Sequence, residues 1–133
     1  MLQKGDAKMT TKVNTKNAPA AIGPYSQGIV CGSLVFTSGQ IALDATTGAL
    51  TGDNIAEQTH KVCANLGEIL SSAGSSFEQV VKTVCYLADM NDFAEFNKVY
   101  AEYFTSRPAR SCVAVKALPK GALVEIEVIA ELN

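Results

Sequence analysis

The chain has 133 residues and a formal net charge of −2, with 47% hydrophobic and 18% charged residues. This length suits one domain, and the apolar content is high enough to build a core, which argues against disorder. Because there is no basic cluster, the sequence is not typical of a nucleic-acid-binding protein. The apolar runs are only a few residues long and no lipidation motif occurs, so no membrane partner is predicted either.

The first eight residues, MLQKGDAK, are polar and aperiodic, and Met9 follows them. We expect residues 1–8 to be a leader or cloning remnant and residues 9–133 to form one domain. The four cysteines include no CxxC pair, and His60 is the only histidine, so zinc-type spacing is absent and no metal site is predicted. The sequence offers no secretory signal, so we expect reduced, mostly buried thiols in a cytoplasmic protein.

A β-hairpin and a helix are predicted in the first half of the chain. The apolar runs 29–31 and 34–37 flank the turn dipeptide Gly32-Ser33. A helix is predicted over 54–72, capped by Asp53 and ended by Gly74. Its core-facing stripe at helical spacing consists of Ile55, Thr59, Val62, Leu66, Ile69, Leu70 and Ala73.

A strand and a second helix follow. Residues 80–87 are rich in β-branched side chains and predict a strand with apolar residues on both faces. Asp92-x-x-Glu95 predicts a capping box at the start of the next helix, and Pro108 prevents the helix from continuing.

Two further strands, 109–115 and 123–132, close the chain around a turn at 118–122. The order is therefore ββαβαββ, which predicts an α+β domain with one sheet and two helices. Two helices cover only one face of such a sheet. We therefore expect a symmetric homo-oligomer to cover the other face.

Arg110 is the first residue that carries chemistry. In a strand that begins at Ala109, Arg110 and Cys112 share a face. A guanidinium is a rigid fork suited to two-point binding of a carboxylate or phosphate. The structural alternative is an ordinary salt bridge to Glu125 or Glu127 on the neighbouring strand.

Glu125 and Glu127 alternate with apolar residues in the last strand, so the strand has a core face and a carboxylate face. The carboxylates either form a solvated outer surface, or one of them is half buried and orients a water molecule. Desolvation would then raise the pKa of that carboxylate. For Cys112 we favour a place in a pocket wall over a nucleophile, because no histidine is nearby in sequence. His60 and Tyr86 are interpreted as structural.

Six segments in order resemble one known family. They are NAPAAIGPYSQ (17–27), TSGQI (37–41), DMNDF (89–93), PARSCV (108–113), LPK (118–120) and EIE (125–127). Together they resemble the RidA/YjgF family of reactive-intermediate imine/enamine deaminases, also called the L-PSP endoribonuclease or translation initiation inhibitor family. The resemblance covers residues 9–133.

The resemblance implies a chorismate-mutase-like fold, with a mixed sheet, two helices on one face and a homotrimer that has clefts between its subunits. It also implies a deaminase that hydrolyses small 2-imino acids or enamines, such as 2-iminobutanoate and 2-iminopropanoate, to 2-keto acids and ammonia. No metal or cofactor is implied.

Site residues follow from the matched motifs. Arg110 matches the family's carboxylate-binding arginine, and Glu125 matches the residue that positions water, so these two are the expected catalytic residues. Cys112 matches a cysteine whose backbone lies beside the substrate. The remaining cleft residues implied by the resemblance are Tyr25, Ser38, Gly39 and Asn97. One departure is the short stretch 105–107, where Arg107 adds a second charge near Arg110 and bears on the pocket entrance and substrate size.

Two further functions stay open at this stage. The first is a regulatory protein that binds small carboxylate metabolites without turning them over. The second is an endoribonuclease or translation inhibitor, which the acidic composition and the lack of a histidine pair disfavour.

Overall fold

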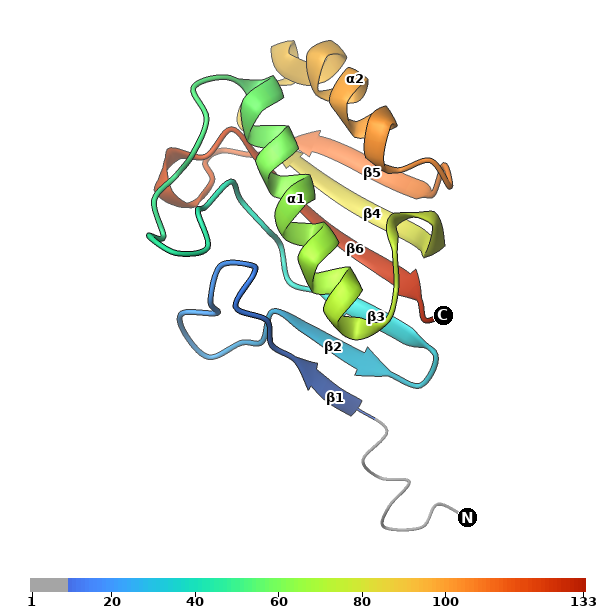
Figure 1. Cartoon of the computed structure of the whole chain (residues 1–133). Helices are drawn as coiled ribbons and strands as arrows, with labels where there is room; N and C mark the ends of the chain where they lie inside the picture. Colours follow the sequence, from blue (N-terminus) through green and yellow to red (C-terminus); the bar gives the residue numbers. More distant parts are fainter. Residues whose placement is uncertain (1–9) are drawn as a thin grey trace.

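The computed structural model describes residues 10–133, so the expected leader at 1–8 and Met9 lie outside the described residues. One six-stranded sheet has the strand order β1-β2-β3-β6-β4-β5. Its neighbours are antiparallel except for β4 and β5, which are parallel. Both helices lie on the same face of the sheet (Figure 1). The predicted α+β class, with a mixed sheet and two helices on one face, is confirmed.

The predicted elements all form, and one strand is added. The strands are β1 (Thr10–Val13), β2 (Gly28–Cys31), β3 (Leu34–Thr37), β4 (Val80–Leu87), β5 (Ala109–Ala114) and β6 (Val124–Glu131), and the helices are α1 (Ile55–Ala73) and α2 (Phe93–Tyr103). Strand β1 was not predicted; it extends the predicted β2–β3 hairpin by pairing with β2 at the sheet edge. A short 3₁₀ turn at Pro119–Gly121 occupies the predicted turn before β6.

Helix α1 is capped one residue later than predicted. The side chain of Asn54 accepts a hydrogen bond from the backbone N–H of Glu57 at 2.9 Å. Asp53 was wrong as the cap, because only its backbone N–H takes part, donating to Oε1 of Glu57 at 2.7 Å. The two bonds close a reciprocal cap around the first turn. Gly74 ends the helix with a left-handed φ of 83°, as predicted.

The predicted capping box of α2 is wrong. Asp92 has a helical backbone conformation and makes no side-chain capping bond. The carboxylate of Asp89 instead accepts the N–H of Asn91 at 2.9 Å and begins a 3₁₀ turn that runs into α2. The polar cap therefore precedes the helix by one turn. The N–H groups at the start of that turn have no backbone acceptor within it, and the side chain of Asp89 supplies one.

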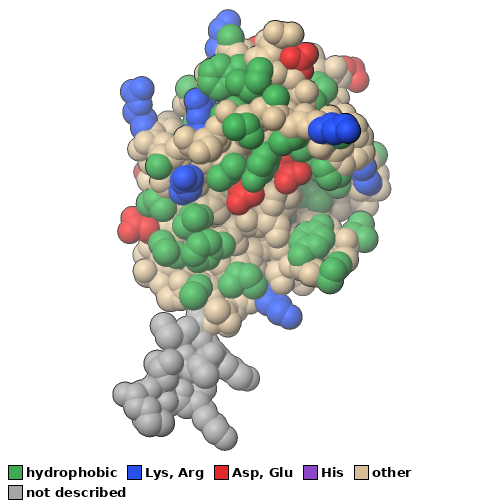
Figure 2. Space-filling model, turned by 180° about the vertical axis from the view of Figure 1, so that it is seen from behind, with side chains coloured by type: hydrophobic (Ala, Val, Ile, Leu, Met, Phe, Trp, Pro, Cys, Tyr) green, Lys and Arg blue, Asp and Glu red, His purple; other side chains and the backbone are tan. Residues whose placement is uncertain are grey.

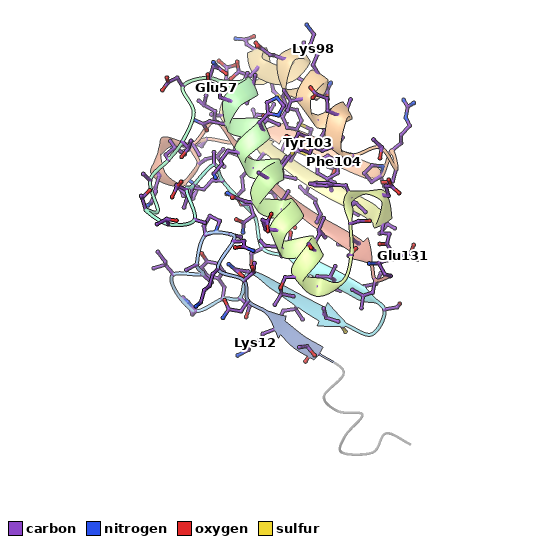
Figure 3. The ribbon with its side chains drawn as sticks, viewed as in Figure 1. Lys12, Glu57, Lys98, Tyr103, Phe104 and Glu131 are labelled. Atoms are coloured by element: carbon purple, nitrogen blue, oxygen red, sulfur yellow. The ribbon has the colours of Figure 1, made fainter. Side chains whose placement is uncertain are left out.

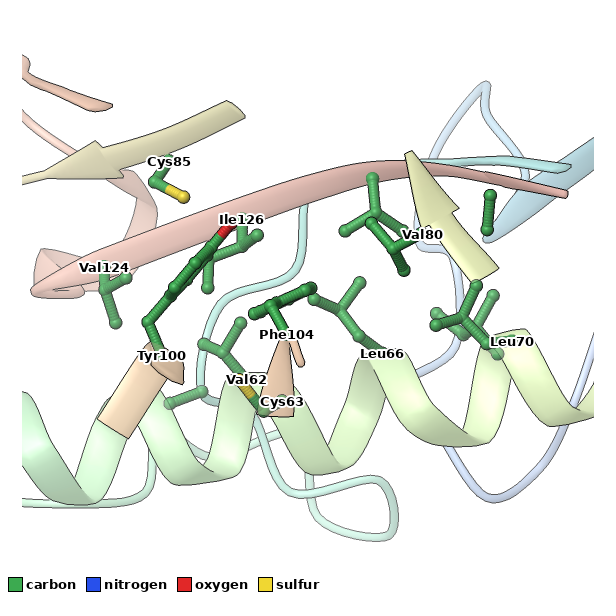
Figure 4. Packing of buried hydrophobic residues seen from close by; sticks show 14 of the residues in the cluster. Val62, Cys63, Leu66, Leu70, Val80, Cys85, Tyr100, Phe104, Val124 and Ile126 are labelled. Atoms are coloured by element: carbon green, nitrogen blue, oxygen red, sulfur yellow. The ribbon is translucent and has the colours of Figure 1, made fainter. Parts of the chain in front are cut away.

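The core lies between the helices and the sheet. Val62 and Leu66 of α1 lie towards Val124 and Ile126 of β6, whereas Leu70 lies further along the same helix (Figure 4). These five side chains are fully buried, and the three from α1 belong to the predicted stripe. Of that stripe, Ala73 at the end of the helix is only partly buried. Each one contributes about 1.5–3 kcal/mol of hydrophobic stabilisation when removed from water.

All four cysteines are free thiols. Cys63 and Cys85 are buried, Cys112 is partly buried and Cys31 is exposed, so the expectation of mostly buried thiols holds for the first two alone. Burial raises the pKa of Cys85 to about 12 and also raises the pKa of Cys63. These two thiols are therefore unreactive near neutral pH.

The second face of the sheet carries no helix in the described chain (Figure 1). Seen from this side, hydrophobic side chains surround a few acidic ones (Figure 2). Phe36 of β3 is 39% exposed and Val113 of β5 is 48% exposed. We call this surface, with Phe36, Val84, Tyr86, Val113, Glu125, Glu127 and Ile129, the open face. Within residues 10–133, no helix has the length and apolar content needed to cross a membrane.

Candidate active site

The guanidinium of Arg110 lies along α2. Its Cζ is 4.8 Å from the ring centroid of Tyr100 and 5.4 Å from that of Phe93. Its Nη1 donates to Oδ1 of Asn97 at 2.7 Å. Phe93, Asn97 and Tyr100 follow one another at helical spacing, so one face of α2 supplies all three contacts. The aromatic rings attract the cation, and the amide fixes its rotation.

A cleft of about 700 Å³ opens beside this guanidinium. It is lined by Asn97, Tyr100, Ala101, Phe104, Thr105, Arg107, Pro108 and Arg110, and we call it the arginine cleft. Among residues 10–133, its lining includes two guanidinium groups and no carboxylate. A cleft of this composition favours an anionic ligand.

The alternative salt bridge from Arg110 to Glu125 or Glu127 is wrong, for two reasons. First, β4 lies between β5 and β6, so the strands are not neighbours. Second, Arg110 pairs with Thr83, which is buried under the helices, whereas Glu125 and Glu127 lie on the open face. The sheet itself separates the cation from both acids.

Glu125 lies near the start of β6, where it pairs with Tyr86 of β4. Its side chain is partly buried. Burial, followed by the neighbouring carboxylate of Glu127, raises the pKa of Glu125. Glu127 accepts a hydrogen bond of 3.0 Å from the hydroxyl of Tyr86. A carboxylate with a raised pKa is a better proton acceptor than an ordinary one, which suits it to activate water.

The carboxylate of Glu125 lies against the bare backbone of Gly39. A Cβ on Gly39 would stand 2.8 Å from Cδ of Glu125 and closer still to Oε2. The next residue, Gln40, exchanges backbone hydrogen bonds with Ile126 at 2.9 and 3.1 Å. This bridge fixes the segment after β3 beside β6, so the absence of a side chain at Gly39 makes the space that Glu125 occupies.

A second cleft, of about 340 Å³, surrounds Glu125. Its lining consists of Pro19, Ala20, Ile22, Tyr25, Gln27, Gly39, Gln40, Ile41, Leu43, Pro119, Lys120 and Glu125, and we call it the glutamate cleft. Tyr25 and Gly39, expected as cleft residues, are part of it. Ser38 is not; its hydroxyl donates to the carbonyl of Ser26 and holds the preceding turn.

The loop over the glutamate cleft is tied down by Gln27. This buried side chain accepts the N–H of Thr15 at 2.7 Å and donates to the carbonyls of Thr15 and Pro19 at 3.0 and 2.9 Å. The sequence places Gln27 only at the end of the motif NAPAAIGPYSQ (17–27). Its position just before a strand could have indicated this role, because a buried glutamine side chain needs hydrogen-bond partners, and the preceding loop is the nearest source of them.

Tyr86 is the other residue with a role that the sequence did not indicate. It was interpreted as structural, yet its hydroxyl holds Glu127 beside Glu125. Side chains alternate between the two faces of a strand. With the register of β4 against β6 known, this alternation would have placed Tyr86, Glu125 and Glu127 on one face.

Cys112 shares the face of Arg110 and pairs with Cys85 across β4 and β5, but it lines neither cleft. Burial raises the pKa of its thiol, with Arg110 acting in the opposite direction. Within the described residues, the side chain of His60 bonds Tyr103 instead, with its Nδ1 2.8 Å from the hydroxyl of that residue. The geometry does not favour a nucleophilic cysteine.

The candidate residues therefore fall into two groups. Arg110 and Asn97 meet in the arginine cleft, whereas Tyr25, Gly39 and Glu125 meet in the glutamate cleft. Since one sheet lies between Arg110 and Glu125, a single chain does not bring them to the same ligand. Among residues 10–133, no cluster of three or more metal-ligating side chains is present.

Comparison with known proteins gives the family. The family model described as Endoribonuclease L-PSP matches residues 15–132. RutC family protein PH0854 of Pyrococcus horikoshii is 50% identical over 123 residues, covering 92% of this chain and 98% of that protein. The human protein named 2-iminobutanoate/2-iminopropanoate deaminase is 46% identical over 119 residues, covering 89% of this chain and 87% of that protein.

A solved structure agrees with these relatives. The crystal structure of Escherichia coli TdcF with bound serine matches with a TM-score of 0.87 and 41% identity, covering 92% of this chain and 99% of that one. Fold, motifs and relatives agree over nearly the whole described chain, and the protein belongs to the RidA/YjgF family, whose model is described as Endoribonuclease L-PSP.

Proposed function

We propose that this protein hydrolyses small 2-imino acids and their enamines, such as 2-iminobutanoate and 2-iminopropanoate, to 2-keto acids and ammonia. The observation that carries the proposal is the environment of Arg110. Its partly buried guanidinium is held against aromatic rings, in a cleft that no carboxylate of the described residues lines. Such a group binds an organic carboxylate with two parallel hydrogen bonds. The human relative named as a deaminase of these imines supports the same reaction.

The chemistry follows from the residue types. Arg110 stays charged and anchors the substrate carboxylate, while Asn97 keeps the guanidinium oriented. Glu125 accepts a proton as water forms a bond to the imine carbon, and the electron pair of the C=N bond moves to nitrogen, which takes up a proton. The hydroxyl of the resulting carbinolamine then loses its proton, nitrogen takes up a proton, and the C–N bond breaks, which leaves the keto acid and ammonia. The only co-reactant is water.

Two copies of the chain are needed for this reaction, because Arg110 and Glu125 lie on opposite faces of one sheet. We propose that the arginine cleft of one copy meets the glutamate cleft of its neighbour, and that three copies close a ring. Several exposed apolar side chains support such contacts: Ile22 and Tyr25 at the glutamate cleft are 79% and 53% exposed, and Val113 on edge strand β5 is 48% exposed.

The first experiment measures ammonia release from 2-iminobutanoate or 2-iminopropanoate generated enzymatically in the assay. Arg110→Ala removes the anchor and Glu125→Gln removes the base, so each variant is expected to lower kcat/KM by about 100-fold or more. Circular dichroism serves as the folding control. Folded Arg110→Ala protein with wild-type activity would contradict the proposal.

The second experiment tests whether the site is shared. Co-expressed Arg110→Ala and Glu125→Gln chains assemble into mixed oligomers, in which some clefts receive Arg110 from one copy and Glu125 from the next. Random mixing gives about a quarter of the clefts both intact groups, so about a quarter of wild-type activity is expected. Activity that stays at the level of the separate variants would exclude a site shared between copies.

Binding without turnover is the second candidate function, favoured by the bound serine of the TdcF structure. The same assay separates the two functions. Saturable, Arg110-dependent binding of 2-oxobutanoate without any ammonia release would assign the protein to this class.

A further inference from the structure

The sequence contains only two arginines, Arg107 and Arg110, and both line the arginine cleft. The proposed reaction uses only Arg110. Arg107 is exposed at the rim, three residues before it. The chain as a whole carries 13 acidic residues against 11 basic ones, yet none of the acids among residues 10–133 lines this cleft. Two arginines therefore line one cleft, and no carboxylate from the part of the chain that the structure describes lines it with them.

The backbone holds Arg107 in a defined position. Its φ of 53° is in the left-handed region, which a residue with a side chain rarely adopts. The N–H of Arg107 donates to the carbonyl of Phe104 at 3.1 Å, and the hydroxyl of Ser106 donates to the carbonyl of Val80 at 2.8 Å. Pro108 follows and restricts the chain further. This tight turn between α2 and β5 fixes where the side chain of Arg107 leaves the backbone, at the mouth of the cleft.

We propose that Arg107 determines specificity by binding a second carboxylate, so that the preferred substrates are 2-imino dicarboxylates rather than 2-imino acids with an alkyl side chain. The inference rests on the proposed function and adds the substrate class to it. Arg110 would bind the carboxylate next to the C=N carbon, and Arg107 the carboxylate at the far end of the substrate. An alkyl chain gains nothing from a cation at that position, whereas a carboxylate gains a charge-assisted hydrogen bond.

The test compares two stable keto acids, 2-oxoglutarate and 2-oxopentanoate, by calorimetric titration of the full chain. They have the same carbon chain, and a methyl group in the second replaces the distal carboxylate of the first. Wild-type protein is expected to bind 2-oxoglutarate more tightly. Arg107→Gln is expected to weaken 2-oxoglutarate binding about fivefold to tenfold and to change 2-oxopentanoate binding by less than about twofold.

Lys98→Gln is the matched control, because Lys98 is exposed on α2 and does not line the cleft (Figure 3). It removes the same charge from the protein and is expected to leave the ratio of the two affinities unchanged. If Lys98→Gln lowers the ratio as much as Arg107→Gln, the preference reflects net charge and the inference is overturned.

The assay also separates the inference from the proposed function. Equal weakening of both ligands by Arg107→Gln, or no preference in the wild type, overturns the role of Arg107 and leaves Arg110 as the anchor. Unchanged binding of both ligands to folded Arg110→Ala protein overturns the proposed function itself. Ammonia release from the two corresponding imines, made by an amino-acid oxidase in the assay, is expected to show the same preference in kcat/KM.

Discussion

The carboxylate of Glu125 occupies a space that exists because Gly39 has no side chain. Gly39→Ala is expected to push this carboxylate away from its place and lower kcat/KM by about 100-fold, since a shift of about 1 Å in a reacting group has an effect of that size. The fold should survive, because the clash falls on the end of a side chain rather than on the backbone. Steady-state ammonia release and thermal unfolding measure the two effects.

A double variant shows whether Gly39 acts through Glu125. If it does, adding Gly39→Ala to Glu125→Gln costs far less activity than it costs in the wild type. Fully additive losses would mean that Gly39 affects catalysis by another route.

The raised pKa of Glu125 makes both activity and stability depend on pH. A base must be ionised, so kcat/KM is expected to fall on acidification at a pH above the 4.5 of an ordinary glutamate. Because the folded-state pKa is raised, folding favours the protonated form, and this stabilisation is lost as the pH rises through the folded pKa. Glu125→Gln should therefore raise Tm relative to wild type above that pKa, and the difference should vanish below the unfolded pKa.

Glu127 provides the control for this titration. Its carboxylate contributes to the raised pKa of Glu125, so Glu127→Gln is expected to move the acid limb of the rate profile to lower pH. If the acid limb of the kcat/KM profile stays in place in Glu127→Gln, or if Glu125→Gln leaves that profile unchanged, the titration belongs to another group.

At the scale of elements, the loop between β1 and β2 depends on a single side chain. Gln27→Ala removes the partners of the N–H of Thr15 and of the carbonyl of Pro19, so the free energy of unfolding is expected to fall by about 2–3 kcal/mol. Urea denaturation measures this loss. Gln79→Ala, whose amide bonds only the exposed Ser76, should change stability by less than about 0.5 kcal/mol.

The same loop forms part of the glutamate cleft, so Gln27→Ala should also raise KM for the imine substrate. If both stability and KM of Gln27→Ala match the wild type, the tether has no role in holding the loop.

At the scale of the whole molecule, the open face is the surface that another copy would cover. Val113→Asp places a carboxylate in its apolar part. Burying even an unpaired neutral polar group in an interface costs about 1–3 kcal/mol, and a charge costs more. We expect association to weaken roughly tenfold to hundredfold in sedimentation velocity, with a matching loss of activity on dilution. Ala64→Asp, on the exposed side of α1, is the control and should leave association unchanged.

Much of the fold was predictable because local signals agreed with one another. The apolar stripe of α1, Gly74 at its end and the Gly32-Ser33 turn each depend on neighbouring residues only. Strand β1 was missed because four residues, three of them polar, form a strand only when β2 is there to pair with them. The cap of α2 was missed because a 3₁₀ turn preceding the helix moves the polar acceptor to Asp89.

The candidate site was predictable residue by residue but not in its arrangement. Alternation along β5 placed Arg110 and Cys112 on one face, as observed. The position of β4 between β5 and β6 is a long-range property of the sheet, and no local pattern in the sequence encodes it. The register of β4 against both strands is equally long-range, and it decides that Arg110 and Glu125 face away from each other.

The four tyrosines stand at four separate places in the fold, and the sequence has no tryptophan. Tyr25 lines the glutamate cleft, Tyr86 bonds Glu127, Tyr100 lies under Arg110 and Tyr103 bonds His60 between the helices. Near-ultraviolet absorption and emission of the protein therefore come largely from reporters already positioned at these places. Exchanging them one at a time for phenylalanine would show which tyrosine gives each change in absorption or emission. Ligand entry, subunit docking and helix separation could then be followed separately, without any attached dye.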